Sequence, residues 1–108
     1  MVNAVRPQTL AEMLRAHPSE FVLLDVRELD EREIGHIEPS LHIPMNEVPN
    51  RLAEIPKDKK LVVYCHHGTR SLMVAGYLEG AGFPSPSNLE GGIDAWSRVV
   101  DPKVPRYT

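Results

Sequence analysis

The sequence predicts a three-layer α/β domain in which helices cover both faces of a mainly parallel sheet. Short apolar runs that favour strands alternate along the chain with segments whose apolar side chains recur at helical spacing. The two clearest runs, residues 21–24 and 60–65, are continuous, which is typical of strands buried on both faces. Because 108 residues are too few for two cores, we expect one domain over residues 1–108.

The first predicted elements are a helix and a buried strand. Thr9 and Glu12 have the spacing of a capping box, so we expect a helix that begins there and ends near residue 17. The apolar run at residues 21–24 then predicts a strand with Asp25 at its carboxyl end.

Three shorter elements follow this strand. Residues 30–34 can form one polar helical turn that stops at Gly35, and residues 42–44 resemble a brief edge strand that a proline limits. A helix is expected after Asn46. It would turn inward Val48, Leu52 and Ile55.

The second half of the chain predicts two strands and two helices. Residues 60–65 form the clearest strand, which ends at Cys65, and Ser71 can cap the helix that follows. The packing face of that helix would consist of Leu72, Ala75, Tyr77 and Leu78. A short strand at residues 87–89 precedes a closing helix that begins at Ile93.

Composition and charge limit the classes of function. The net charge is -3 and Lys and Arg are scattered, which argues against a nucleic-acid partner. No apolar run approaches the roughly 20 residues that span a bilayer, and the first residues do not resemble a secretory signal. We therefore expect a cytoplasmic protein that contacts neither membrane nor nucleic acid.

The candidate chemistry lies in the loop after the strand at residues 60–65. The loop contains Cys65, His66, His67, Gly68, Thr69, Arg70 and Ser71. Its backbone amides can converge on one point, the following helix adds about half a positive charge, and Arg70 is a permanent cation. This environment favours a thiolate at Cys65, and the same donors would stabilise a persulfide anion.

Two other interpretations of the lone cysteine are weaker. A lone cysteine is most often a small apolar core residue, but the loop context argues against that role here. A zinc site built from Cys65, His66 and His67 is disfavoured because adjacent residues rarely point at one ion. We therefore expect no metal ligand in this loop.

The loop resembles the active-site loop of rhodanese domains, a family of sulfurtransferases. Residues 23–28 and 33–44 are similar to the N-terminal signature of that family, and residues 89–96 to its C-terminal one. The resemblance implies the rhodanese-like α/β fold. It also implies transfer of a sulfane sulfur from thiosulfate or a related persulfide to a thiol, cyanide or protein acceptor, with no cofactor.

The same resemblance implies a role for each site residue. Cys65 would form the persulfide, the amides of residues 66–71 would surround it, and Arg70 would complete the anion site. Asp25 would be a structural acid that fixes the loop or nearby side chains, and Arg27 would pair near the same pocket. Thiosulfate-using members often have lysine where this chain has His67, which makes a preference for thiosulfate less expected.

Two alternatives stay open at this stage. Phosphatases with this fold have a cysteine-to-arginine loop one residue longer, whereas four residues separate Cys65 from Arg70 here (70 - 65 - 1 = 4). That size suits sulfur better than a phosphoryl group. A persulfide carrier in a sulfur relay would have the same sequence features as a turnover enzyme.

Overall fold

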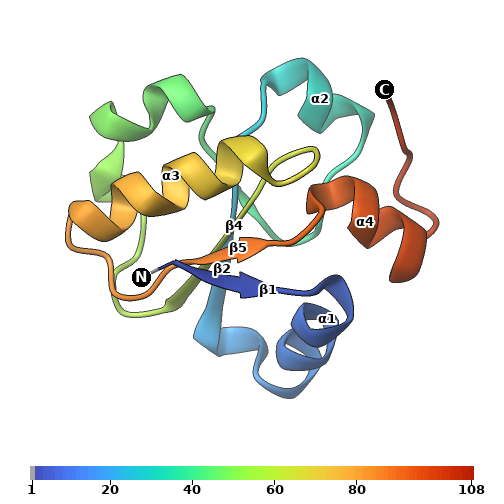
Figure 1. Cartoon of the computed structure of the whole chain (residues 1–108), viewed down its shortest axis with the longest axis horizontal. Coiled ribbons are helices and arrows are strands. Elements are labelled where there is room, and N and C mark those ends of the chain that lie inside the picture. The colour runs from blue at the N-terminus through green and yellow to red at the C-terminus, as the bar shows by residue number, and fades with distance from the viewer. Residues whose placement is uncertain (1) are drawn as a thin grey trace.

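A five-stranded sheet forms the centre of the computed structural model, which describes residues 2–108 (Figure 1). Its strands are β1 (Asn3–Val5), β2 (Phe21–Asp25), β3 (Leu41–His42), β4 (Lys60–Tyr64) and β5 (Ser87–Leu89). They lie in the order β1-β5-β4-β2-β3, and all the pairings are parallel. The strand that precedes Cys65 is therefore the central one.

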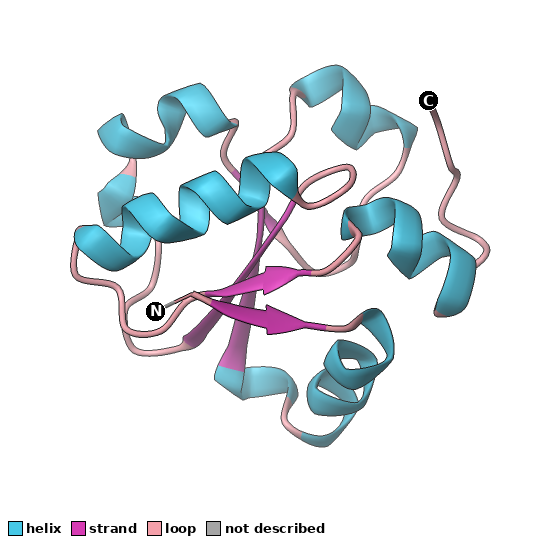
Figure 2. Cartoon of the chain, viewed as in Figure 1, coloured by secondary structure: helices cyan, strands magenta, loops and turns pink. Residues whose placement is uncertain are grey.

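Helices cover both faces of this sheet (Figure 2). The helices are α1 (Pro7–Ala16), α2 (Leu29–Ile34), α3 (Thr69–Gly80) and α4 (Gly92–Val99), with short 3₁₀ helices at Pro18–Glu20, Met45–Asn50 and Leu52–Glu54. α1 and α4 contact each other and belong to one apolar cluster, whereas α3 belongs to the other. The predicted three-layer α/β class with a parallel sheet is confirmed.

The adjacent strands β2 and β4 are apolar on both faces. Successive side chains of a strand point to opposite faces, so Leu24 and Val63 join the cluster with α3 while Leu23 and Val62 join the cluster with α1 and α4. All four side chains are buried. This double burial explains why both strands read as continuous apolar runs in the sequence.

The structure corrects the predicted start of the first helix. α1 begins at Pro7 with Arg6 at the N-cap, and no side chain caps it. The capping box at Thr9 and Glu12 was wrong, because proline at the first helical position already has the helical φ and lacks the amide that would need a partner. β1 before this helix was not predicted, since its three residues are too few to show a period.

The helix predicted after Asn46 was also wrong. This segment forms two 3₁₀ helices, and Pro49 lies inside the first of them. Proline has no amide hydrogen for an α-helical bond and clashes with the preceding turn, so a continuous α-helix is disfavoured here. Val48 and Ile55 are nevertheless buried as predicted.

α3 is present, but its start and its packing face differ from the prediction. It begins at Thr69 with Gly68 at the N-cap in a left-handed conformation, so Ser71 is not the cap. Its buried side chains are Ser71, Val74, Ala75 and Leu78, whereas the predicted Leu72 and Tyr77 are largely exposed. Because α3 is so rich in apolar residues, its sequence shows no clear polar face, and the predicted packing face was therefore partly wrong.

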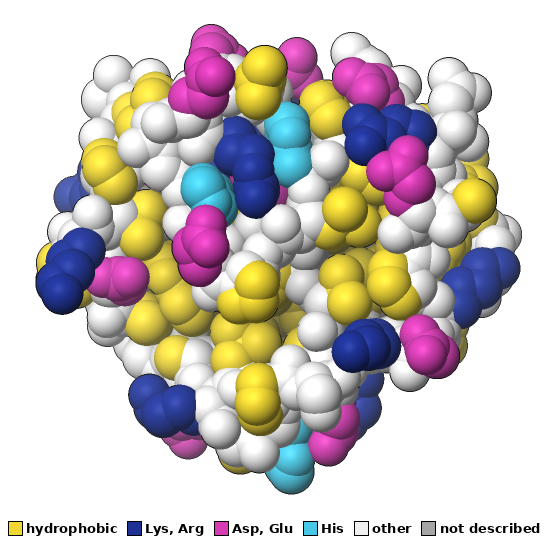
Figure 3. All heavy atoms as spheres, turned by 180° about the vertical axis from the view of Figure 1, so that it is seen from behind, with side chains coloured by type: hydrophobic (Ala, Val, Ile, Leu, Met, Phe, Trp, Pro, Cys, Tyr) yellow, Lys and Arg dark blue, Asp and Glu magenta, His cyan; other side chains and the backbone are white. Residues whose placement is uncertain are grey.

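No helix within residues 2–108 has the length and apolar character needed to cross a membrane. On the face seen in Figure 3, basic and acidic side chains alternate around exposed apolar ones instead of gathering by sign. Such a mixed surface does not resemble the concentrated positive charge of a nucleic-acid-binding face.

The corrected packing face of α3 can be tested by two matched substitutions. Leu78 is 0% exposed and Leu72 is 52% exposed, so both changes to alanine alter helix propensity equally but only one opens a cavity. We expect Leu78→Ala to lower the free energy of unfolding by about 2–5 kcal/mol. Leu72→Ala should change it by less than about 0.5 kcal/mol in urea denaturation; the reverse ranking would contradict this packing.

Candidate active site

The candidate site lies at the carboxyl edge of the sheet, beyond the ends of three adjacent strands. Asp25 ends β2, Cys65 follows β4, and Asn88 lies near the end of β5. The parallel register pairs Asp25 with Tyr64 and Val63 with Asn88, so this edge brings the groups together. Open parallel sheets bind ligands at such edges.

The sulfur atom of Cys65 is surrounded by hydrogen-bond donors. Its Sγ accepts hydrogen bonds from the amide nitrogens of Gly68 at 3.1 Å and Ser71 at 3.4 Å. The hydroxyl of Ser71 lies 3.3 Å from the same sulfur. Cys65 is only 1% exposed, so these donors act where little water competes with them. Two of the amides expected at residues 66–71 thus reach the sulfur.

Ser71 connects the sulfur to β5. Its hydroxyl lies 2.5 Å from Oδ1 of Asn88, and the side-chain amide of Asn88 donates to the carbonyl of Gly68 at 3.2 Å. A hydroxyl has one proton, so Ser71 can donate to Asn88 or to the sulfur but not to both. Asn88 therefore holds both loop residues that touch the sulfur.

The carbonyls of the loop are bound by the start of α4. The amides of Ile93 and Asp94 donate to the carbonyls of Cys65 at 2.9 Å and His66 at 3.1 Å. A Cβ on Gly92 would lie 2.3 Å from the carbonyl oxygen of His66, and Gly92 has a φ of +63°. Glycine is therefore required for this close approach.

The guanidinium of Arg70 is paired with a carboxylate on α2. Its two terminal nitrogens donate to the two oxygens of Glu31 at 2.7 and 2.8 Å. These hydrogen bonds, which outweigh burial, lower the pKa of Glu31 to about 2, and the same pair raises the pKa of Arg70. The cation that was expected to complete the anion site thus already has a counter-ion.

The C-terminal tail contacts the loop through Tyr107. The Tyr107 ring stacks on His66 with centroids 3.9 Å apart, and its carbonyl lies 2.9 Å from Nε2 of His66. Burial, followed by the neighbouring His67, lowers the pKa of His66 below its ordinary value. His66 is therefore neutral at pH 7. His67 and Thr69, in contrast, are exposed.

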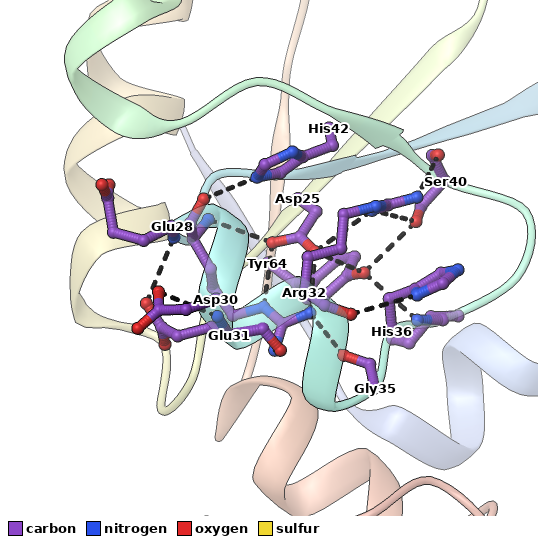
Figure 4. A network of polar contacts seen from close by, with 12 residues as sticks. Asp25, Glu28, Asp30, Glu31, Arg32, Gly35, His36, Ser40, His42 and Tyr64 are labelled. Atoms are coloured by element: carbon purple, nitrogen blue, oxygen red, sulfur yellow. Dashed lines mark hydrogen bonds and ion pairs between the residues drawn. The ribbon is translucent and has the colours of Figure 1, made fainter.

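Asp25 and Arg27 form a buried ion pair, and both are 0% exposed. Figure 4 shows Asp25 with two of its other partners, Tyr64 and Arg32. Nε and a terminal nitrogen of Arg27 donate to the two oxygens of Asp25 at 2.9 and 2.8 Å. Tyr64 and Arg32 also donate to Asp25. Arg27 in turn donates to the carbonyl of Gly35 on the far side of α2.

The charges of this pair are stabilised together. Burial raises the pKa of Asp25, but the hydrogen bonds and charge of Arg27 outweigh it, so the pKa lies below its ordinary value. Burial alone would lower the pKa of Arg27, and its bonds to Asp25 and Tyr107 raise it instead. Both side chains therefore stay ionised at neutral pH.

The structure brings together most of the predicted site residues and adds others. Asp25 and Arg27 pair with each other beside Tyr64, while Glu31, Tyr64, Asn88 and Tyr107 were not among the predicted site residues. Glu31, Asn88 and Tyr107 reach the site from other elements, so no local spacing marked them, whereas Tyr64 directly precedes Cys65 at the end of β4. Within residues 2–108 no group of three His, Cys, Asp or Glu is arranged to hold a metal ion.

Comparison with known proteins identifies the family. The sequence model described as "Rhodanese-like domain" matches residues 6–99, and the chain belongs to this family. It is 40% identical over 98 residues to the sulfurtransferase of Allochromatium vinosum, covering 91% of each chain. It is 36% identical to the thiosulfate sulfurtransferase GlpE of Pseudomonas savastanoi, covering 83% of each.

The fold agrees with this assignment. The crystal structure of a rhodanese-like domain protein from Staphylococcus aureus superimposes with a TM-score of 0.83 at 28% identity. The match covers 99% of this chain and 100% of that one. The predicted rhodanese-like fold is thereby confirmed.

Removing one partner of the buried ion pair should strongly destabilise the fold. Asp25→Ala leaves Arg27 and Arg32 without their carboxylate, and breaking a buried pair from one side costs about 3–5 kcal/mol. Urea denaturation should show this loss. Asp58→Ala, which removes an exposed carboxylate, should change the free energy of unfolding by less than about 0.5 kcal/mol. Equal effects would mean that Asp25 is not essential to the fold.

The pair between Glu31 and Arg70 should stabilise the fold only when Glu31 is ionised. Its folded pKa of about 2 lies below the ordinary 4.5, so its contribution is present above pH 4.5 and is lost as pH falls towards 2. The stability difference between wild type and Glu31→Gln should be constant above this window and shrink within it. Chemical denaturation at a series of pH values measures it; a difference that grows with acid would contradict the pairing.

Proposed function

We propose that this chain is a sulfurtransferase that carries a sulfane sulfur on Cys65 as a persulfide. The observation that supports this most is the pair of backbone amides that donate to Sγ, from Gly68 at 3.1 Å and Ser71 at 3.4 Å, at the start of α3. These groups suit a sulfur anion, whose charge is diffuse and whose radius is large. The names of the relatives as sulfurtransferases point to the same chemistry.

In the first step the Cys65 thiolate attacks the outer sulfur of the donor. An Sγ–S bond forms while the donor S–S bond breaks, and its electron pair leaves with sulfite or with a thiolate. The product is a persulfide anion on Cys65. The positive end of α3 and the loop amides stabilise this charge before and after transfer.

In the second step an acceptor takes the terminal sulfur. A thiolate or cyanide attacks that sulfur, the new S–S or C–S bond forms, and the Cys65 thiolate leaves as the original nucleophile. Within the protein, only Cys65 forms and breaks covalent bonds in these two steps. The proposed donors are small sulfur anions or persulfides, and the proposed acceptors are thiols, cyanide or a protein. We place this reaction in the cytoplasm and in a single domain over residues 1–108.

Arg70, Asp25 and Arg27 have supporting roles in this proposal. Asp25 and Arg27 fix β2 to α2, and α2 presents Glu31 to Arg70. His66, His67 and Thr69 contribute backbone to the short loop. The loop leaves four residues between Cys65 and Arg70, a size that favours sulfur over a phosphoryl group.

Loading of Cys65 can be tested by intact-mass measurement. Incubation with thiosulfate or with a small persulfide should add one sulfur atom, and a reductant should remove it. Cys65→Ser should gain nothing and lose transfer to cyanide while keeping its melting temperature, since the hydroxyl is of similar size. Wild type that gains no sulfur from any donor would refute the proposal.

A turnover assay with free thiosulfate and cyanide separates an enzyme from a relay carrier. A turnover enzyme converts free thiosulfate and cyanide to products in many cycles. A carrier is loaded by a protein donor and turns over no free thiosulfate.

A further inference from the structure

Glu31 pairs with Arg70, the cation of the loop that follows Cys65. Arg70 supplies two hydrogen bonds to this carboxylate at 2.7 and 2.8 Å, in the bidentate geometry that is strongest for such a pair. The carboxylate is 16% exposed and the guanidinium 32% exposed. The positive charge of Arg70 is therefore largely compensated within the protein.

Tyr107 holds the carboxylate in this position. Its hydroxyl donates to Oε2 of Glu31 at 2.6 Å and accepts a hydrogen bond from Arg27 at 3.1 Å. Oε2 is the oxygen that also accepts from Arg70, so the carboxylate is fixed by donors from two separate elements. Because three strong donors converge on it, Glu31 cannot readily swing away from Arg70 when an anion arrives.

The other basic groups nearby do not restore a positive charge. Arg27 is fully buried and paired with Asp25, and Arg32 donates to the same carboxylate. His66 is held between Tyr107 and His67 and stays neutral. Stabilisation of an anion at Cys65 thus depends on two backbone amides and on the N-terminus of α3, whose dipole is equivalent to about half a positive charge.

We propose that Glu31 is a specificity-determining residue that disfavours the thiosulfate dianion and favours donors with a single negative charge, namely persulfides of thiols. The proposal rests on the sulfur-transfer function proposed for Cys65. Because Glu31 cancels the charge of Arg70, a dianion loses twice the attraction that a monoanion loses, since Coulomb energy scales with charge. Tyr107 is the positioning residue that keeps the carboxylate in place.

The experiment compares two donors, thiosulfate and the persulfide of 2-mercaptoethanol, at low ionic strength and about pH 8.5, where imidazoles are neutral. Glu31→Gln keeps the size and hydrogen-bonding capacity of the side chain but removes its charge. We expect Glu31→Gln to raise kcat/KM for thiosulfate on the order of tenfold by lowering KM. For the persulfide we expect kcat/KM to rise about threefold. Glu33→Gln, an exposed change on the same helix, should leave the ratio of donors unchanged.

Two further measurements separate a charge effect from a structural one. Glu31→Asp keeps the charge and should retain the wild-type ratio of donors. In wild type, KM for thiosulfate should not rise with added salt, whereas in Glu31→Gln it should rise, because salt then screens the attraction of Arg70.

The outcomes are distinct for the two proposals. If neither donor loads Cys65, the sulfur-transfer function itself is wrong. If both load but Glu31→Gln leaves the ratio unchanged, or if wild-type KM for thiosulfate rises with salt, the role of Glu31 is overturned while sulfur transfer stands.

Discussion

Asp25 and Arg27 form a buried ion pair on which the arrangement of the whole carboxyl edge depends. Arg27 also donates to the carbonyls of Glu31 and Gly35, within α2 and at its C-terminal end, and to the hydroxyl of Tyr107. Because α2 is only six residues long and has no buried residue of its own, it has little packing to hold it there. Glu31 thus faces Arg70 because the Asp25–Arg27 pair at the end of β2 holds α2 in place.

The loop that carries Cys65 is held from two other sides. The first amides of α4 bind the carbonyls of Cys65 and His66, so these carbonyls face α4. Asn88 on β5 binds Gly68 and Ser71, and amides of both residues point at the sulfur. The loop amides therefore point at the sulfur because α4 and Asn88 bind the other polar groups of the loop. The loop sequence alone does not determine this orientation.

The sequence was sufficient for the features with a local signal. Continuous apolar runs marked β2 and β4, and the short loop before a helix marked Cys65 and its donors. The corrections fall where local signals compete: proline overrode the capping box before α1, and Pro49 prevented an α-helix. Glu31, Asn88 and Tyr107 could not be found this way, because their contacts join residues 17 to 80 positions apart. Only the packing of the sheet brings such residues together.

Neutral groups and ion pairs have different positions at this site. The groups that touch Sγ are neutral dipoles fixed by the fold, whereas the nearby cations Arg27 and Arg70 each have a carboxylate partner. Fixed dipoles need no reorganisation when charge develops on sulfur, and salt screens their short-range hydrogen bonds far less than it screens an exposed ion. A free cation in the same place would bind any small anion and would tie up the site with sulfate or phosphate. Pairing Arg70 with Glu31 keeps the guanidinium ordered and compensates its charge, which is the basis on which we propose that donors are selected by their charge.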